Sequence, residues 1–340
     1  MNKKIITPIV VASLAVGQSF GASALWDGPG YNTTWTAHGD GAGWVDPSDG
    51  STDIGIPNGV DEIAYFDNSS FYASGGSLYL STENSGAGSI FNITLGGWDS
   101  TGPTTGRGVE LRSATAGTST LTFEVSSGNA SILIKNTGGT NSGVTYQVDV
   151  ALASSVDVMV HRIYSGSLDG VNFRQLVTGT GGINKTGKGL VRFDGTAGVN
   201  TFSGGLSVSD GIVYASKDGA LGTGDVTIAQ SAVDTTAALE ITTGITDAIF
   251  DTSNLYLGSF GGNFSTITLA GGVSETIGGL FFDGLAQSTG TWGSTSSGAT
   301  YQNDDWFAGT GVLNVVPEPS AFGLLLGIAA FGALYIRRRR

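Results

Sequence analysis

The sequence predicts an all-β protein, and three observations carry this prediction. Glycine accounts for 56 of the 340 residues, about twice the usual share. Hydrophobic residues reach 40%, too many for a disordered chain. Between Leu25 and Val316, short alternating segments are separated by Gly, Asn and Ser, and no stretch of useful length has the 3.6-residue period of an amphipathic helix.

Residues 1–24 have the three parts of a secretory signal peptide. Lys3 and Lys4 are basic, Ile5–Val16 is apolar, and small residues follow, with Ala22 and Ala24 at the two positions that signal peptidase recognises. We therefore expect signal peptidase to cut after Ala24 and the protein to be exported. A retained N-terminal anchor helix is the alternative.

Three of the six tryptophans, Trp26, Trp35 and Trp44, crowd into the start of the predicted mature chain. Exposed rings at these positions could stack on a glycan. The interpretation that we prefer is a cap over the open end of the first β layer, because the terminal units of repetitive folds need a distinct closing structure.

Short strands recur further along the chain. Thr120–Val125 alternates between polar and apolar residues, and Ser131–Lys135 does so in part. Strands are predicted at five segments: Val109–Arg112, Ser119–Val125, Ser131–Lys135, Val144–Val150 and Val156–Val160.

Residues 181–228 hold a more specific pattern. Lys185-Thr186-Gly187-Lys188-Gly189 forms a turn before an apolar strand, and Asn200-Thr201-Phe202-Ser203-Gly204-Gly205 forms a second turn before two further strands. This stretch resembles the autotransporter-associated (passenger-associated) repeat, although Arg192 and Asp194 stand where apolar or small polar residues are commoner.

The resemblance implies that residues 25–316 form one elongated domain, a right-handed parallel β-helix, or solenoid. At roughly 20–25 residues per coil, the domain would contain on the order of a dozen coils. An antiparallel β-sandwich pair is the alternative that glycine-rich alternating strands also permit. Residues 275–284 and 303–313 are similar to the C-terminal end of exported proteins with this repeat, and Val312–Val316 is predicted to be the last strand of a closing cap.

Residues 317–340 form a tripartite tail. Pro317, Glu318 and Pro319 precede an apolar run, Ser320–Ile336, whose 17 residues are at the short end of what crosses a bilayer as a helix. Arginine ends the chain four times, at Arg337, Arg338, Arg339 and Arg340. Because arginines are too costly to move across a membrane, we expect them to stay in the cytoplasm.

The tail resembles the PEP-CTERM sorting signal of bacteria that make extracellular polysaccharide. The resemblance implies a transmembrane helix that anchors the protein in the inner membrane. An exosortase, a membrane-embedded transpeptidase, then cuts near the Pro-Glu-Pro tripeptide and passes the protein to the cell surface or extracellular matrix. An ordinary C-terminal membrane anchor is the alternative.

Charge and composition exclude several kinds of partner and cofactor. Residues 25–316 contain 27 acidic and 9 basic residues, a net charge of −18, which argues against nucleic acid as a partner. With no cysteine and two histidines, the chain can form no disulfide and is a poor candidate for zinc or copper. We expect no metal and no cofactor.

Chemistry-bearing side chains occur mostly singly. Asp157, His161, Arg162 and Asp169 form the densest mixed group, and Asp157 and His161 would share one face of a strand. No nucleophile accompanies them, so we expect a structural or adhesive protein associated with exopolysaccharide and not an enzyme. A polysaccharide lyase or glycoside hydrolase, or a glycan-binding module on the same fold, is the alternative.

Overall fold

The computed structural model describes residues 23–26, 33–34, 43–48, 52, 55–66, 78–81, 92–102, 109–113, 118–136, 143–161 and 170–316. These residues form strands, turns and bends only, which confirms the all-β class. Several predicted features lie outside them: Ala22, Trp35, Arg162, Asp169 and the whole of residues 317–340.

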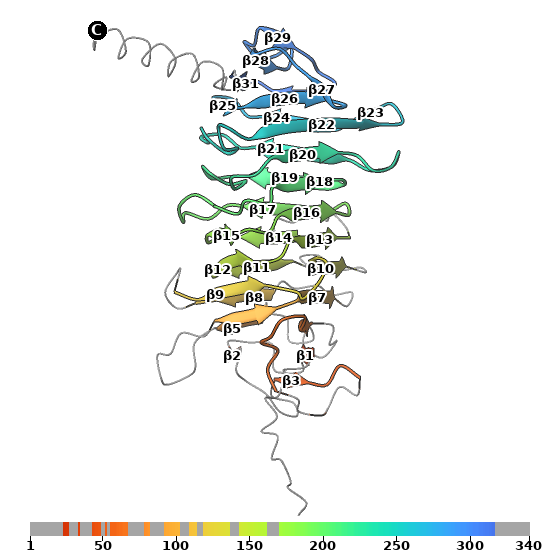
Figure 1. Cartoon of the computed structure of the whole chain (residues 1–340), viewed down its shortest axis with the longest axis vertical. Helices are drawn as coiled ribbons and strands as arrows, with labels where there is room; N and C mark the ends of the chain where they lie inside the picture. The colour runs from red at the N-terminus through yellow and green to blue at the C-terminus, as the bar shows by residue number, and fades with distance from the viewer. Residues whose placement is uncertain are drawn as a thin grey trace, which may run out of the picture.

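Most strands belong to three sheets whose neighbours pair in parallel (Figure 1). Along the first sheet run β1 (Ala24–Trp26), β4 (Ile63–Tyr65), β7 (Gly97–Gly102), β10 (Ala130–Asn136), β13 (Val156–Val160), β16 (Ile183–Thr186), β18 (Leu206–Val208), β20 (Val226–Ala229), β22 (Asn254–Phe260) and β26 (Gly279–Phe282).

The second sheet contains β2 (Thr33–Thr34), β5 (Leu78–Ser81), β8 (Val109–Arg112), β11 (Val144–Gln147), β14 (Gly170–Phe173), β17 (Leu190–Phe193), β19 (Gly211–Ala215), β21 (Ala237–Ile241), β24 (Thr266–Leu269) and β30 (Phe307–Gly309). The third contains β6 (Ile93–Leu95), β9 (Thr120–Phe123), β12 (Asp149–Leu152) and β15 (Val177–Gly179).

Consecutive strands go to different sheets, so that the chain returns to each sheet after one circuit, here called a coil. In the first sheet Val156 pairs with Ile183, Ile183 with Leu206, and Leu206 with Val226, which are steps of 27, 23 and 20 residues. Figure 1 shows the resulting stack of layers. Parallel pairing of this kind contradicts the antiparallel sandwich over the described strands, because a sandwich of hairpins would pair neighbours antiparallel.

Both ends of the stack add antiparallel strands. At the start, β3 (Trp44–Val45) pairs with β1. Near the other end β23 (Asn263–Phe264) pairs with β22, and β27 (Leu285–Ala286) pairs with β26. A fourth sheet holds β25 (Ser274–Ile277), β28 (Gly290–Gly293), β29 (Tyr301–Gln302) and β31 (Val312–Val315). The predicted last strand is therefore confirmed as β31.

One predicted strand is wrong. Val144–Val150 is not continuous but consists of β11 and the start of β12, which belong to different sheets. The chain turns at Val148, which is 1% exposed because the corner packs against the core. Strands β8, β9, β10 and β13 confirm the other four segments within one or two residues at each end.

Apolar side chains alternate inward along each strand and form one continuous core. Buried aromatic rings contact one another from coil to coil. Between Trp98 and Tyr146 the centroids are 5.4 Å apart, between Tyr146 and Phe173 5.5 Å, and between Phe173 and Phe193 5.2 Å. These separations lie in the favourable range for aromatic pairs, so the column ties successive coils together through the interior.

Candidate functional site

The predicted signal-peptidase site leads into the first strand. Ala24 begins β1, pairs with Ala64 of β4, and is fully buried. The Ser23 hydroxyl accepts a hydrogen bond from the Ile63 amide at 3.1 Å. A protease can therefore reach the bond after Ala24 only before β1 pairs with β4. Cleavage there remains a prediction.

Two of the three candidate glycan-stacking tryptophans lie in the core. Trp26 is 1% exposed and Trp44 is fully buried, with their rings edge to face at 5.2 Å. Trp44 also packs edge to face on Phe66 at 5.5 Å, and Phe66 stacks on Trp98 at 4.4 Å. A ring buried in this way offers no face to a sugar, so these contacts favour the cap over the stacking platform.

Lys185 of the repeat-like stretch points into the core. It follows Ile183 on the inward face of β16 and lies between Val158 and Val208 in the register of the first sheet. Its Nζ donates to the carbonyl oxygens of Thr186, Gly187 and Asp210 at 2.8, 2.5 and 3.0 Å. Burial lowers the pKa of this fully buried ammonium group to about 7, partly offset by the charge of Asp210.

Asn200, from the second turn of the same stretch, joins two neighbouring coils. Its Oδ1 accepts from the Val177 amide at 2.9 Å and from Lys217 Nζ at 2.8 Å, while its Nδ2 donates to the Ala220 carbonyl at 2.7 Å. Burial lowers the pKa of Lys217 to about 8. The sequence gave no role to Lys185 or Asn200. Their position in the inward phase of apolar residues was the available signal.

Glu275 is a buried carboxylate in β25. Its two oxygens accept hydrogen bonds from the backbone amides of Ala248 and Ile249 at 2.9 and 2.8 Å. Burial raises the pKa of this group to about 7, although the two amides act in the opposite direction. Lys185, Asn200 and Glu275 all bind backbone groups of the interior, which makes them structural links.

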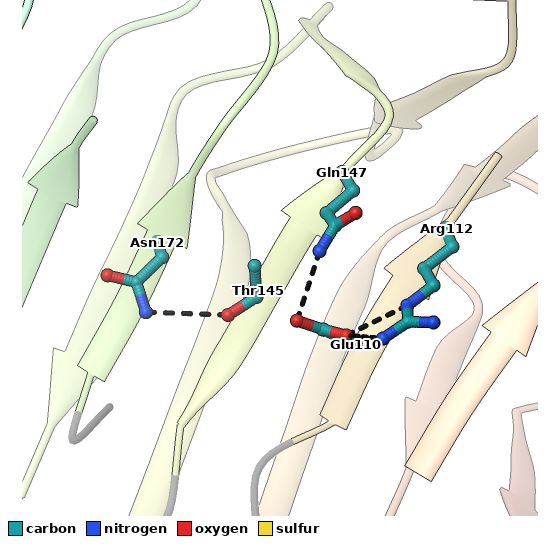
Figure 2. A network of polar contacts seen from close by, with 5 residues as sticks. All are labelled: Glu110, Arg112, Thr145, Gln147 and Asn172. Carbon is teal, nitrogen blue, oxygen red and sulfur yellow. Dashed lines mark hydrogen bonds and ion pairs between the residues drawn. The ribbon is translucent and has the colours of Figure 1, made fainter. Parts of the chain in front are cut away.

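The outer face of the second sheet carries a ladder of polar contacts (Figure 2). Glu110 of β8 accepts hydrogen bonds from Nε and Nη2 of Arg112 at 2.8 and 2.5 Å, and from Nε2 of Gln147 on the next strand at 3.0 Å. Asn172 Nδ2 donates to Thr145 Oγ1 at 3.4 Å. The side chains therefore connect β8 to β11 and β11 to β14 from outside.

This row continues along the sheet with one residue per strand. Arg192 of β17 is in register with Tyr214 of β19, and Tyr214 with Glu240 of β21. The Arg192 guanidinium lies 5.1 Å from the centre of the Tyr214 ring, which is within the range of a cation–π contact. Burial and the Glu240 charge raise the pKa of Tyr214.

Asp157 and His161, the candidate acid–base pair, are both exposed on the outer side of the first sheet. Asp157 Oδ1 accepts hydrogen bonds from Nδ2 of Asn129 and of Asn184 at 2.9 and 2.8 Å. The carboxylate thus links three successive strands of the stack. Over the described ranges, no group of three or more His, Cys, Asp or Glu side chains is placed to hold a metal ion.

The tail supplies the one match to a known family. Residues 315–340 match the PEP-CTERM protein-sorting motif, which indicates a protein that is sorted by an exosortase to the cell surface. No family match supports the autotransporter-associated repeat, so that resemblance stays a prediction. Neither a curated protein nor a solved structure matches the chain. None of the helices in the described part of the chain could span a membrane, and the predicted span lies outside that part.

Proposed function

We propose that this chain is an exported structural or adhesive protein of the cell surface or extracellular matrix, associated with exopolysaccharide and without enzymatic activity. The observation that carries the proposal is the sorting motif at residues 315–340. Before processing, the tail holds the protein in the inner membrane. An exosortase-type transpeptidase then acts near Pro317, Glu318 and Pro319, and signal peptidase removes residues 1–24.

We further propose that residues 25–316 form a right-handed parallel β-helix. Three parallel sheets that share every circuit of the chain support this architecture. Right-handed winding follows from the general preference of parallel strand connections. Such a stack makes a long, rigid protein without disulfides, because each coil is stabilised by its two neighbours.

The use of the polar side chains supports a structural role. Lys185 and Glu275, whose pKa values are shifted to about 7, bind backbone groups of the interior and present no reactive atom to a substrate. The outer ladders at Glu110 and Asp157 join neighbouring strands. A polysaccharide lyase or glycoside hydrolase would instead need carboxylates free to meet a substrate.

The test is the mass of the C-terminal peptide of the native protein recovered from the cell surface or the medium. We expect a terminus near Pro317 to Pro319, with the apolar run and the arginines removed. An intact Arg340 would contradict sorting by an exosortase and leave a membrane-tethered protein. Incubation of the protein with acidic and neutral polysaccharides should release no reducing ends or unsaturated products; release of either would refute the non-enzymatic role.

A further inference from the structure

A cavity of about 580 Å³ lies beside the antiparallel strand pair β22–β23. Its wall comes from three separate segments: the loop after β20, the tip of the β22–β23 hairpin, and the loop before β30. All three segments are described continuously, since residues 170–316 have no gap. The cavity is therefore built by tertiary packing and not by one loop alone.

The charge at this cavity is negative. Asp234, Asp304 and Asp305 line it, and no Lys or Arg is among its lining residues. Hydrogen bonds from the Thr295 hydroxyl and amide to Asp304, at 2.7 and 2.8 Å, lower the pKa of that carboxyl group. Asp304 is thus an anion at neutral pH, and the cavity repels acidic sugars and attracts a cationic group.

An aromatic ring forms another part of the wall. Phe264 is 36% exposed, and its ring packs edge to face on Trp306 at 4.9 Å. Next to it, Asn263 Nδ2 donates to the Val233 carbonyl at 2.9 Å and fixes the hairpin tip. The exposed face of Phe264 is therefore held in place, and such a face suits the C–H side of a pyranose ring and a neighbouring ammonium group.

Gln230 is the second, independent indication of a ligand. It lines the cavity, is only 9% exposed, and donates from Nε2 to the Phe264 carbonyl at 2.8 Å. Its Oε1 has no hydrogen-bond partner. Because a buried amide oxygen without a partner costs free energy, a donor from a ligand would remove this penalty.

We propose that this cavity binds an amino-sugar unit of a polysaccharide. The carboxylates Asp304 and Asp305 receive the ammonium group, the Phe264 ring packs against the apolar side of the sugar, and Gln230 Oε1 accepts a hydrogen bond. A bare metal ion would leave the aromatic wall without a role. This inference deepens the proposed matrix function by naming the class of glycan, and it rests on that function for access to polysaccharide.

The test is isothermal titration calorimetry of the full-length chain in detergent. The ligand is a glucosamine oligosaccharide, compared with its N-acetylated counterpart of equal length. Asp305→Asn should weaken binding about tenfold, as expected for a lost hydrogen bond to a charged group. Phe264→Ala should weaken it a few-fold, and the N-acetylated oligomer should bind at least tenfold more weakly than the amine.

Two variants outside the cavity are the matched controls. Asp251→Asn removes an exposed carboxylate, and Phe260→Ala removes a ring that is 44% exposed on the same hairpin. Both should bind as the parent does. Equal binding by all four variants would refute the site and indicate general attraction to an acidic surface, and equal binding of the N-acetylated oligomer would refute the charge argument.

Calcium chloride provides the third comparison. Calcium that binds the parent, is lost in Asp305→Asn and is unchanged in Phe264→Ala would make this a metal site and overturn the proposal. Binding by purified protein does not depend on sorting. A failed titration therefore leaves the C-terminal mass unaffected, and an unprocessed C-terminus leaves the titration unaffected.

Discussion

Replacement of Glu275 by glutamine should change how stability depends on pH. The pKa of Glu275 is about 7 in the folded protein against 4.5 for a free glutamate. Between these values the folded state binds more protons than the unfolded state, so stability is fully present below pH 4.5 and is lost as pH rises to about 7. A difference of about 2.5 pKa units corresponds to a loss of roughly 3 kcal/mol.

Glu275→Gln removes the charge but keeps the shape. The glutamine has one oxygen for the two amides of Ala248 and Ile249, so one of them loses its acceptor, at a cost of about 1 kcal/mol. We therefore expect the variant to be less stable than the parent near pH 4.5 by about 1 kcal/mol. Near pH 7.5 it should be more stable by about 2 kcal/mol, because the parent then buries a charge.

The measurement is urea unfolding of both proteins, followed by tryptophan fluorescence, from about pH 4.5 to about pH 7.5. Glu124→Gln, at a half-buried position in another coil, is the matched control and should run parallel to the parent. Asp247 and Asp251 also raise the pKa of Glu275, but both variants retain them. Stability curves of the parent and Glu275→Gln that keep a constant separation would refute the reasoning.

Three further predictions concern the interior and the corners. Burial lowers the pKa of Lys185, so parent stability should rise between about pH 7 and 10.5, and Lys185→Met should abolish that rise in the same urea titrations. Gly205→Ala should lower the melting temperature more than Gly244→Ala, because only at Gly205 would a Cβ lie 2.6 Å from a carbonyl oxygen, whereas both residues have positive φ. The Tyr146 hydroxyl is buried without a hydrogen-bond partner, so Tyr146→Phe should raise stability by roughly 1 kcal/mol on urea unfolding; a loss would contradict this.

Alternation and glycine content were enough to predict the class and four of five tested strands. They could not reveal the corner at Val148, because Tyr146, Val148 and Val150 all read as apolar positions of one continuous strand. The three sheets meet at such corners, where side chains on both sides of the turn face the core. A period of two therefore detects strands in this fold but not the points where they change sheet.

The interior links were missed for a different reason. A lysine or glutamate in a strand ordinarily faces solvent, since burial of a charge without partners is costly. Lys185 avoids that cost with three backbone carbonyls, one of them from Asp210, 25 residues further along the chain. No local pattern could identify that partner, because the pairing depends on coils whose lengths vary from 20 to 27 residues.

The two kinds of interior contact divide the stack. From Trp26 to Phe202, buried rings link one coil to the next, whereas Lys185, Lys217 and Glu275 add charge-assisted links toward the C-terminal side. In a stack where each coil contacts only its neighbours, stability is approximately the sum of such nearest-neighbour contacts. The aromatic column does not titrate near neutral pH, but the lysines and Glu275 do. A change of pH should therefore alter the C-terminal coils first, which is also the part next to the sorting motif at residues 315–340.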